Sequence, residues 1–233
     1  PSCLAKKSLT MANLLIIDTS GPTGYVALAH GPTVVASQYS MQAQEHASFV
    51  QPAIESLLQQ TGYHFSQINA ITVVNGPGSY TGLRVGLASA KGLCFALNIP
   101  LITLPTLQVM AMAASTQVPD AWQCPMIDAR RMEVFFALYD TRHSLMQGPA
   151  NAILDDNWLL ESLTQHPICF SGSGSQKWRQ VCQHPHAIFI PQPSTLPAAA
   201  QLALRQYEQG NFANLAYATP FYIKDFYTPA AKA

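Results

Sequence analysis

The sequence is poor in charged residues, which make up only 10% of its 233 residues against a typical share of about 25%. Lysine plus arginine and aspartate plus glutamate number 12 each, so the formal net charge is zero. Since phosphate neutralisation needs a basic surplus, a strongly electrostatic mode of nucleic-acid binding is not expected. A weakly charged surface also favours association with another protein, which would cover part of it.

Closely spaced cysteines and long apolar runs are missing as well. The five cysteines form no CxxC motif and no close pair, which argues against a secreted disulfide framework. No run approaches the roughly 18 apolar residues that a membrane-spanning helix needs. These absences predict a cytoplasmic protein that does not bind membranes. Met11 has the character of a natural start, so residues 1–10 are interpreted as a leader, a misassigned start or an expression remnant.

The first half of the chain has the pattern of an α/β lobe with the element order βββαβα and a further strand. A helical period covers residues 42–60, where Pro52 is expected to kink or subdivide the helix. A second helix is expected from about residue 81 to 97. Short apolar runs bounded by turn residues predict strands at 13–18, 25–29, 33–39, 70–74 and 100–104.

The second half repeats this pattern in a looser form. Asp18 and Asp128 lie 110 positions apart, and each ends an apolar run that is followed by a turn and a second strand. Such a repeat predicts a duplicated architecture. We therefore expect an N-terminal lobe, a C-terminal lobe and a segment returning toward the first lobe, at 11–105, 106–215 and 216–233. Within the second half, helices are expected at 157–165 and 194–209, a strand at 167–170, and a strand or extended segment at 219–223.

The most specific motif is NGPGSYTG at residues 75–82, between a buried strand and a helix. Gly76 and Gly78 permit close backbone approach, and Ser79 can cap the helix, whose free N–H groups would form an anion site. Asp18 and Asp128 could orient a metal-bound phosphate or water there. The alternative is a strand-to-helix turn that needs glycine and a cap, with each aspartate capping its own turn. The loop lacks the lysine of a P-loop.

The helix after this loop carries small residues on one stripe, at Gly82, Gly86 and Ala90. Because a glycine inside a helix costs about 1 kcal/mol relative to alanine, two of them imply that something packs closely against the stripe. The candidates are the helix at 42–60, a partner chain, or both. A bulky side chain at Gly86 should then block partner binding and leave the fold largely intact.

His46 is the one histidine near the start of the helix at 42–60. A helical metal site usually needs a second ligand three or four positions later, and those positions are Phe49 and Val50. A lone surface or core histidine is therefore the favoured interpretation. No Ser/His/Asp or Cys/His arrangement can be assembled from spacing alone, so neither a catalytic residue nor a metal ligand is predicted.

Several of these segments together resemble the TsaB (YeaZ) family, the bacterial tRNA threonylcarbamoyladenosine biosynthesis proteins once grouped with the M22 glycoproteases. The resemblance covers nearly all elements of the first half and two segments of the second. It is carried by IIDTS at 16–20, EHASFVQPAI at 45–54, NGPGSYTGLRVG at 75–86, IDARRMEVFFALYD at 127–140 and PFYIK at 220–224.

The resemblance implies a two-lobed ASKHA fold, related to actin, Hsp70 and sugar kinases, in which the second βββαβα-type lobe is degenerate. It also implies a pathway. The catalytic paralogue TsaD transfers a threonylcarbamoyl group to N6 of adenosine 37 in tRNAs that read ANN codons. TsaB binds TsaD as a heterodimer, the ATPase TsaE completes the assembly, and tRNA is contacted mainly through these partners.

The paralogue holds its metal with an H-x-x-x-H pair, and here the first position is His46 but the second is Val50. The resemblance therefore implies a non-catalytic scaffold without a cofactor, although weak binding of ATP or ADP stays open. It also implies that two helices form the partner face, which would pair two copies of the isolated chain. The corresponding interface residues are His46, Phe49, Val50, Ala53, Tyr80, Gly82, Leu83, Gly86 and Ala90.

Two enzymatic alternatives remain open at this point. An ATP-dependent small-molecule kinase or ATPase of the same fold would use Asp18 and Asp128 to organise Mg-nucleotide, but the sequence offers no clear base. A metalloprotease would need a paired histidine or an H-E-x-x-H motif, and neither occurs.

Overall fold

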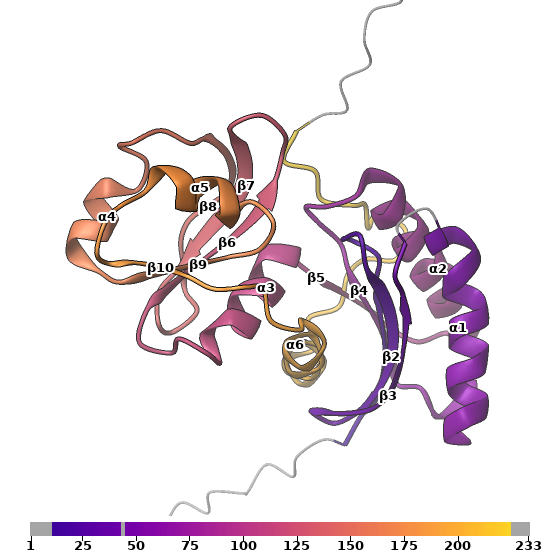
Figure 1. The fold of residues 1–233 in the computed structure, drawn as a ribbon. Helices are drawn as coiled ribbons and strands as arrows, with labels where there is room; N and C mark the ends of the chain where they lie inside the picture. Colours follow the sequence, from indigo (N-terminus) through magenta and orange to yellow (C-terminus); the bar gives the residue numbers. More distant parts are fainter. Residues whose placement is uncertain (1–10, 43–44, 225–233) are drawn as a thin grey trace, which may run out of the picture. The chain divides into compact units, whose positions relative to one another are not determined.

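The computed structural model describes residues 11–42 and 45–224, which form two compact units (Figure 1). The first unit combines the chain up to Asn75 with Ser79–Leu104 and Leu196–Thr219. The second contains Gly76–Gly78, Pro105–Thr195 and the chain from Pro220 onward. The interpretation of residues 1–10, and that of the returning segment beyond residue 224, lie outside the described residues.

The first unit is built on a five-stranded sheet in the order β3-β2-β1-β4-β5. β1, β2 and β3 form an antiparallel meander, whereas β4 and β5 add in parallel to β1. The alternation of apolar runs and tight turns predicted this meander. The strands are β1 (Asn13–Asp18), β2 (Gly24–His30), β3 (Thr33–Ser40), β4 (Ala70–Val74) and β5 (Leu101–Leu104).

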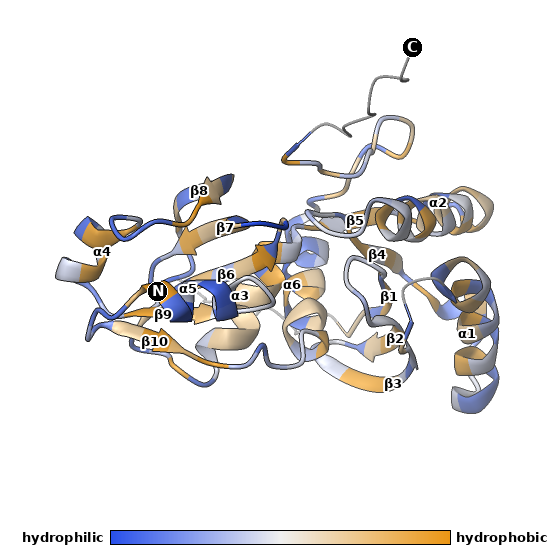
Figure 2. Ribbon diagram, turned by 45° about the horizontal axis from the view of Figure 1, so that its top comes forward, coloured by the Kyte–Doolittle hydropathy of each residue, from blue (hydrophilic) through white to orange (hydrophobic). Residues whose placement is uncertain are grey.

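Helices α1 (His46–Thr61) and α2 (Tyr80–Leu97) cover one face of this sheet, and α6 (Leu196–Gln209) lies on the other (Figure 1). A short 3₁₀ helix, η2 (Phe65–Gln67), precedes β4. Hydrophobic and hydrophilic residues alternate along α1 and α2 in Figure 2, as expected for helices with one face on a sheet. Pro52 lies inside α1 and does not divide it, so the predicted subdivision is wrong. The apolar face of α1 continues on both sides of Pro52.

The second unit has a sheet with the same plan, in the order β10-β9-β6-β7-β8. β6, β7 and β8 are antiparallel neighbours, and β9 and β10 add in parallel to β6. Each strand therefore has a counterpart in the first unit, and the duplication inferred from Asp18 and Asp128 is confirmed. The strands are β6 (Trp122–Asp128), β7 (Glu133–Tyr139), β8 (Leu145–Ile153), β9 (Ile168–Ser171) and β10 (Ala187–Phe189).

The second copy is degenerate in its helices. α4 (Leu160–Gln165) and α5 (Ser175–Val181) have 6 and 7 residues, where their counterparts α1 and α2 have 16 and 18. On the opposite face, α3 (Thr106–Ser115) packs on β6, β7 and β9. Successive residues of β7 accordingly enter different cores: Phe136 packs with an aromatic cluster, and Ala137 packs with Leu107 of α3.

Several elements were not predicted from the sequence, namely α3, β8, α5 and β10. Residues 219–223, expected as a strand or an extended segment, form no strand. We expected α6 in the C-terminal lobe, but it packs on β1, β3 and β5, so the contacts place it in the first unit. The sequence shows which face of α6 is buried, but long-range contacts decide which of the two sheets this face packs on.

Candidate functional site

The end of the loop between β4 and α2 is held by hydrogen bonds to residues of the same chain. Ser79 is the N-cap of α2 and accepts a hydrogen bond on its Oγ from the backbone N–H of Gly82 at 3.3 Å. Its own N–H donates to the carbonyl of Ser20 at 2.7 Å, which ties the helix start to the turn after β1. Gly76 has φ = 124°, a conformation that favours glycine. The predicted cap is therefore present; anion binding at this helix start stays a prediction.

Asp18 ends β1 and is buried. Its Oδ1 accepts hydrogen bonds from the N–H of Ser20 at 2.9 Å and from the Ser20 hydroxyl at 2.7 Å. Burial raises the pKa of this carboxyl above its ordinary value, and the bonds from Ser20 oppose that rise. The carboxyl thus caps the turn that follows β1, which was the alternative to a role in orienting a metal-bound phosphate or water.

Asp128 ends β6 at the equivalent position but lies in a different environment. It is exposed, accepts a hydrogen bond from the N–H of Arg130 at 2.6 Å, and forms an ion pair with Lys177. The hydrogen bond from Lys177 lowers the pKa of Asp128 below its ordinary value. Arg130 and Arg131 both have positive φ in the turn between β6 and β7. The two aspartates are thus equivalent in topology and opposite in electrostatics.

His46 is the first residue of α1, and its side chain is only 1% exposed. Neither ring nitrogen has a hydrogen-bond partner among the described residues. Two glycines leave the room that the ring occupies: a Cβ at Gly24 would lie 2.8 Å from Nε2, and one at Gly82 would lie 3.2 Å from Nδ1. Burial lowers the pKa of His46, and the negative charge of Asp18 opposes this. A core histidine is confirmed.

Val50 follows His46 by one helical turn and is fully buried in the core between α1 and the sheet. This is the position at which the paralogue's second metal ligand would stand. Across the described residues, no group of three or more His, Cys, Asp or Glu side chains could hold a metal ion.

The stripe of small residues on α2 faces the sheet. A Cβ at Gly82 would lie 2.1 Å from the carbonyl oxygen of Thr19, and one at Gly86 would lie 2.4 Å from the Thr19 hydroxyl. That hydroxyl donates to the carbonyl of Gly82 at 2.7 Å. The glycines therefore let α2 approach the end of β1, a neighbour that we did not expect, and Gly82 also lies against His46 of the helix that we did expect. A bulky residue at Gly86 would disturb the sheet, contrary to our expectation that the fold would tolerate it.

The other expected interface residues divide by exposure. Tyr80 is 37% exposed and Phe49 is half-buried, so both present atoms to solvent. The remaining ones are buried in the first unit: His46, Val50, Ala53, Gly82, Leu83, Gly86 and Ala90. Their packing holds α1 and α2 on the sheet. It thereby fixes the positions of the exposed side chains on the outer faces of these helices.

The outer face of α2 carries a continuous exposed stripe, of which only Tyr80 was expected from the sequence. We call this the α2 stripe; its members are Tyr80, Arg84, Ala88, Gly92 and Phe95. The guanidinium of Arg84 donates to the Tyr80 hydroxyl at 2.9 Å, and Phe95 is 82% exposed. The spacing of three and four residues, which places these side chains on one face of a helix, was the available signal in the sequence.

The family model described as "TsaD: tRNA N6-adenosine threonylcarbamoyltransferase" matches residues 33–226. The chain is 32% identical over 174 residues to the tRNA threonylcarbamoyladenosine biosynthesis protein TsaB of Bacillus subtilis, covering 73% of this chain and 75% of that protein. It is 28% identical over 219 residues to TsaB of Escherichia coli, covering 91% and 94%.

Solved structures agree with these relatives. YeaZ from Pseudomonas aeruginosa superposes with a TM-score of 0.76 at 26% identity, covering 91% of this chain and all of that one. An inorganic polyphosphate/ATP-glucomannokinase from Arthrobacter gives a TM-score of 0.51 at 9% identity, covering 84% and 99%. At such low identity the latter shows the fold alone, which is the two-lobed ASKHA fold. No helix of the described residues is long and apolar enough to cross a membrane.

Proposed function

Because the chain belongs to the TsaB (YeaZ) family and has a role in the synthesis of N6-threonylcarbamoyladenosine in tRNA, we propose that it acts as a non-catalytic subunit that binds and activates the transferase TsaD. TsaE joins this assembly, and tRNA is contacted mainly through the partners. The zero net charge agrees with an indirect contact, since the chain has no basic surplus for phosphates.

The single observation that carries this proposal is the α2 stripe. Its two aromatic residues, Tyr80 and Phe95, stand at the ends of a helix whose opposite face is locked on the sheet by Gly82 and Gly86. Aromatic and arginine side chains are enriched at protein interfaces, and Arg84 supplies the latter between them.

The lack of catalysis is supported by the residues around His46. A metal-assisted transfer needs ligands that leave an open coordination position, whereas this imidazole is enclosed between Gly24 and Gly82 and followed by the core residue Val50. Asp18, whose charge acts on His46, is engaged by Ser20.

In the absence of TsaD, we propose that two copies of the chain pair through the same face. An isologous contact covers the exposed side chains of both copies at once. TsaD and a second copy would then compete for the α2 stripe, and the homodimer would dissociate as the heterodimer forms.

The test is reconstitution of threonylcarbamoyl transfer to tRNA from preformed threonylcarbamoyl-adenylate, with TsaD and TsaE, in the presence and absence of this chain. We expect product only when the chain is added, and none from the chain alone. Product from the chain alone would refute the non-catalytic role and would direct attention to Asp18, Asp128 and the loop at 75–82.

A matched pair of variants tests the surface. Phe95→Asp places a charge on the α2 stripe, and Ile153→Asp does the same at a 70% exposed position of β8 in the second unit. Because desolvating an unpaired carboxylate in an interface is costly, Phe95→Asp should weaken TsaD binding at least about tenfold, measured by calorimetry. Ile153→Asp should bind as the parent chain does. Equal affinities for the two variants would show that TsaD binds elsewhere.

A further inference from the structure

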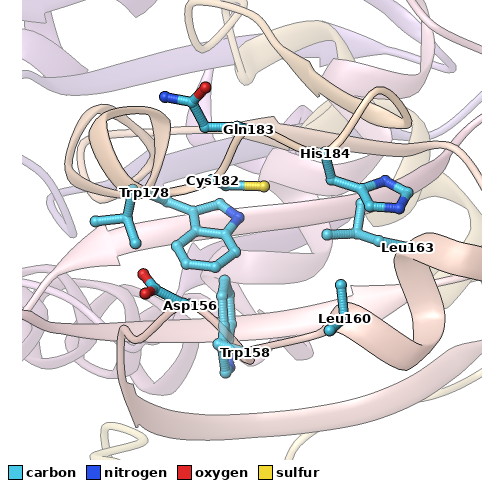
Figure 3. A pocket seen from close by; sticks show the side chains of 9 residues that line it. Asp156, Trp158, Leu160, Leu163, Trp178, Cys182, Gln183 and His184 are labelled. Atoms are coloured by element: carbon cyan, nitrogen blue, oxygen red, sulfur yellow. The ribbon is translucent and has the colours of Figure 1, made fainter.

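A cavity of about 150 Å³ lies in the second unit between α4, α5 and the chain that follows α5. Its apolar walls include Trp158, Leu163 and Trp178, which are labelled in Figure 3. Val181 also lines it. The two indoles meet edge to face with ring centroids 5.0 Å apart. An apolar cavity of this volume holds a molecule about as large as benzene, so the space suits one small ring.

The indole N–H of Trp178 gives this cavity a polar requirement. The side chain is 1% exposed, and its Nε1 has no hydrogen-bond partner among the described residues. Figure 3 shows this nitrogen on the edge of the ring that faces Cys182 and His184. A buried donor without a partner is unfavourable. Because Nε1 is enclosed in the present structure, an acceptor brought in by a ligand would satisfy it once the neighbouring side chains shift slightly.

His184 lines the same cavity and is a second polar group there. Its Nδ1 accepts a hydrogen bond from the backbone N–H of His186 at 3.2 Å, so the proton of the neutral ring is on Nε2. The carboxylate of Asp156 is exposed and lies on the cavity wall, away from the indole nitrogen (Figure 3). Its negative charge disfavours an anionic ligand, although the indole N–H of Trp178 calls for an acceptor.

From these groups we infer that the cavity binds a small neutral aromatic carbonyl compound. The ring lies between the indoles and Leu163, and the carbonyl oxygen accepts the hydrogen bond of Trp178. This site is in the second unit and does not include the α2 stripe. The inference can therefore be tested independently of the proposed binding of TsaD.

The probe is benzamide, titrated into the ¹⁵N-labelled full chain. The sequence contains three tryptophans, so three indole N–H signals are expected, and the one lost in Trp178→Phe identifies Trp178. Trp122 stacks on His166 and does not line the cavity, so its signal is the internal control. We expect a saturable downfield shift of the Trp178 signal with a dissociation constant of about 1 mM, and no shift of the Trp122 signal.

Matched ligands separate the contributions. Benzoate has the same shape and a negative charge, and it should bind several-fold more weakly than benzamide, a difference that Asp156→Asn should reduce. Toluene lacks the acceptor and should bind about fivefold to tenfold more weakly. In Trp178→Phe, which lacks the indole N–H, benzamide and toluene should bind with similar affinity.

The titration of the parent chain tests whether benzamide binds beside Trp178 even if a variant fails to fold. An unchanged Trp178 signal at about 20 mM benzamide, well above the expected dissociation constant, would overturn the inference. So would equal affinities for benzamide and toluene, because the indole donor would then make no contribution.

Discussion

Replacing Gly82 by alanine tests how α2 is held against the end of β1. Taken alone, the change favours the helix by about 1 kcal/mol. In the structure, however, the new Cβ would lie 2.1 Å from the carbonyl oxygen of Thr19. This oxygen belongs to the backbone, so the helix or the turn after β1 has to move. Overpacking of this kind costs about 1–3 kcal/mol.

The movement also breaks the hydrogen bond from the Thr19 hydroxyl to the carbonyl of Gly82, which is worth about 1 kcal/mol. We expect the free energy of unfolding to fall by about 2 kcal/mol in total, after the gain in helix propensity is subtracted. Gly92 is the matched control, since it lies in the same helix and a Cβ there would meet nothing within 4 Å. Gly92→Ala should raise the free energy of unfolding by about 0.5–1 kcal/mol.

The assay is urea unfolding followed by far-UV circular dichroism. Fluorescence is unsuitable, because all three tryptophans lie in the second unit and α2 belongs to the first. With a slope of about 2 kcal/mol per M, Gly82→Ala should lower the midpoint by about 1 M. A midpoint equal to or above that of the parent chain would refute the close contact between α2 and Thr19.

Two further predictions concern the same end of the sheet. Ser79→Ala removes the N-cap of α2 and should lower the free energy of unfolding by about 1 kcal/mol in the same assay, whereas an unchanged midpoint would show that the cap contributes nothing. Asp18→Asn should raise stability at pH 7, because burial raises the folded-state pKa of Asp18. The penalty for its ionisation is present above that pKa and disappears as the pH falls toward about 3.9, the unfolded value. The advantage of the variant should therefore vanish in acid, and an advantage that persists at pH 3 would contradict this assignment.

The sequence by itself determined the elements whose signals are local. β1 was expected over the residues it occupies, 13–18, because an apolar run ends at a turn. The cap at Ser79 followed from residue types at fixed spacing, whereas for His46 the sequence left both a surface and a core position open. The duplication was visible in Asp18 and Asp128, since a repeated supersecondary unit leaves the same residue at the same strand end.

Only the tertiary structure decided which surfaces meet. The sequence showed that small residues line one side of α2, but whether a sheet, a helix or a partner approaches them depends on where distant segments fold. Gly82 and Gly86 lie against the end of β1, Gly82 also lies against His46 of α1, and the α2 stripe on the other side of the helix is exposed. α6 follows the second sheet in the chain and packs on the first. The cavity beside Trp178 arises from segments that close on one another from different elements. Local propensity and periodicity carry no information about such long-range contacts.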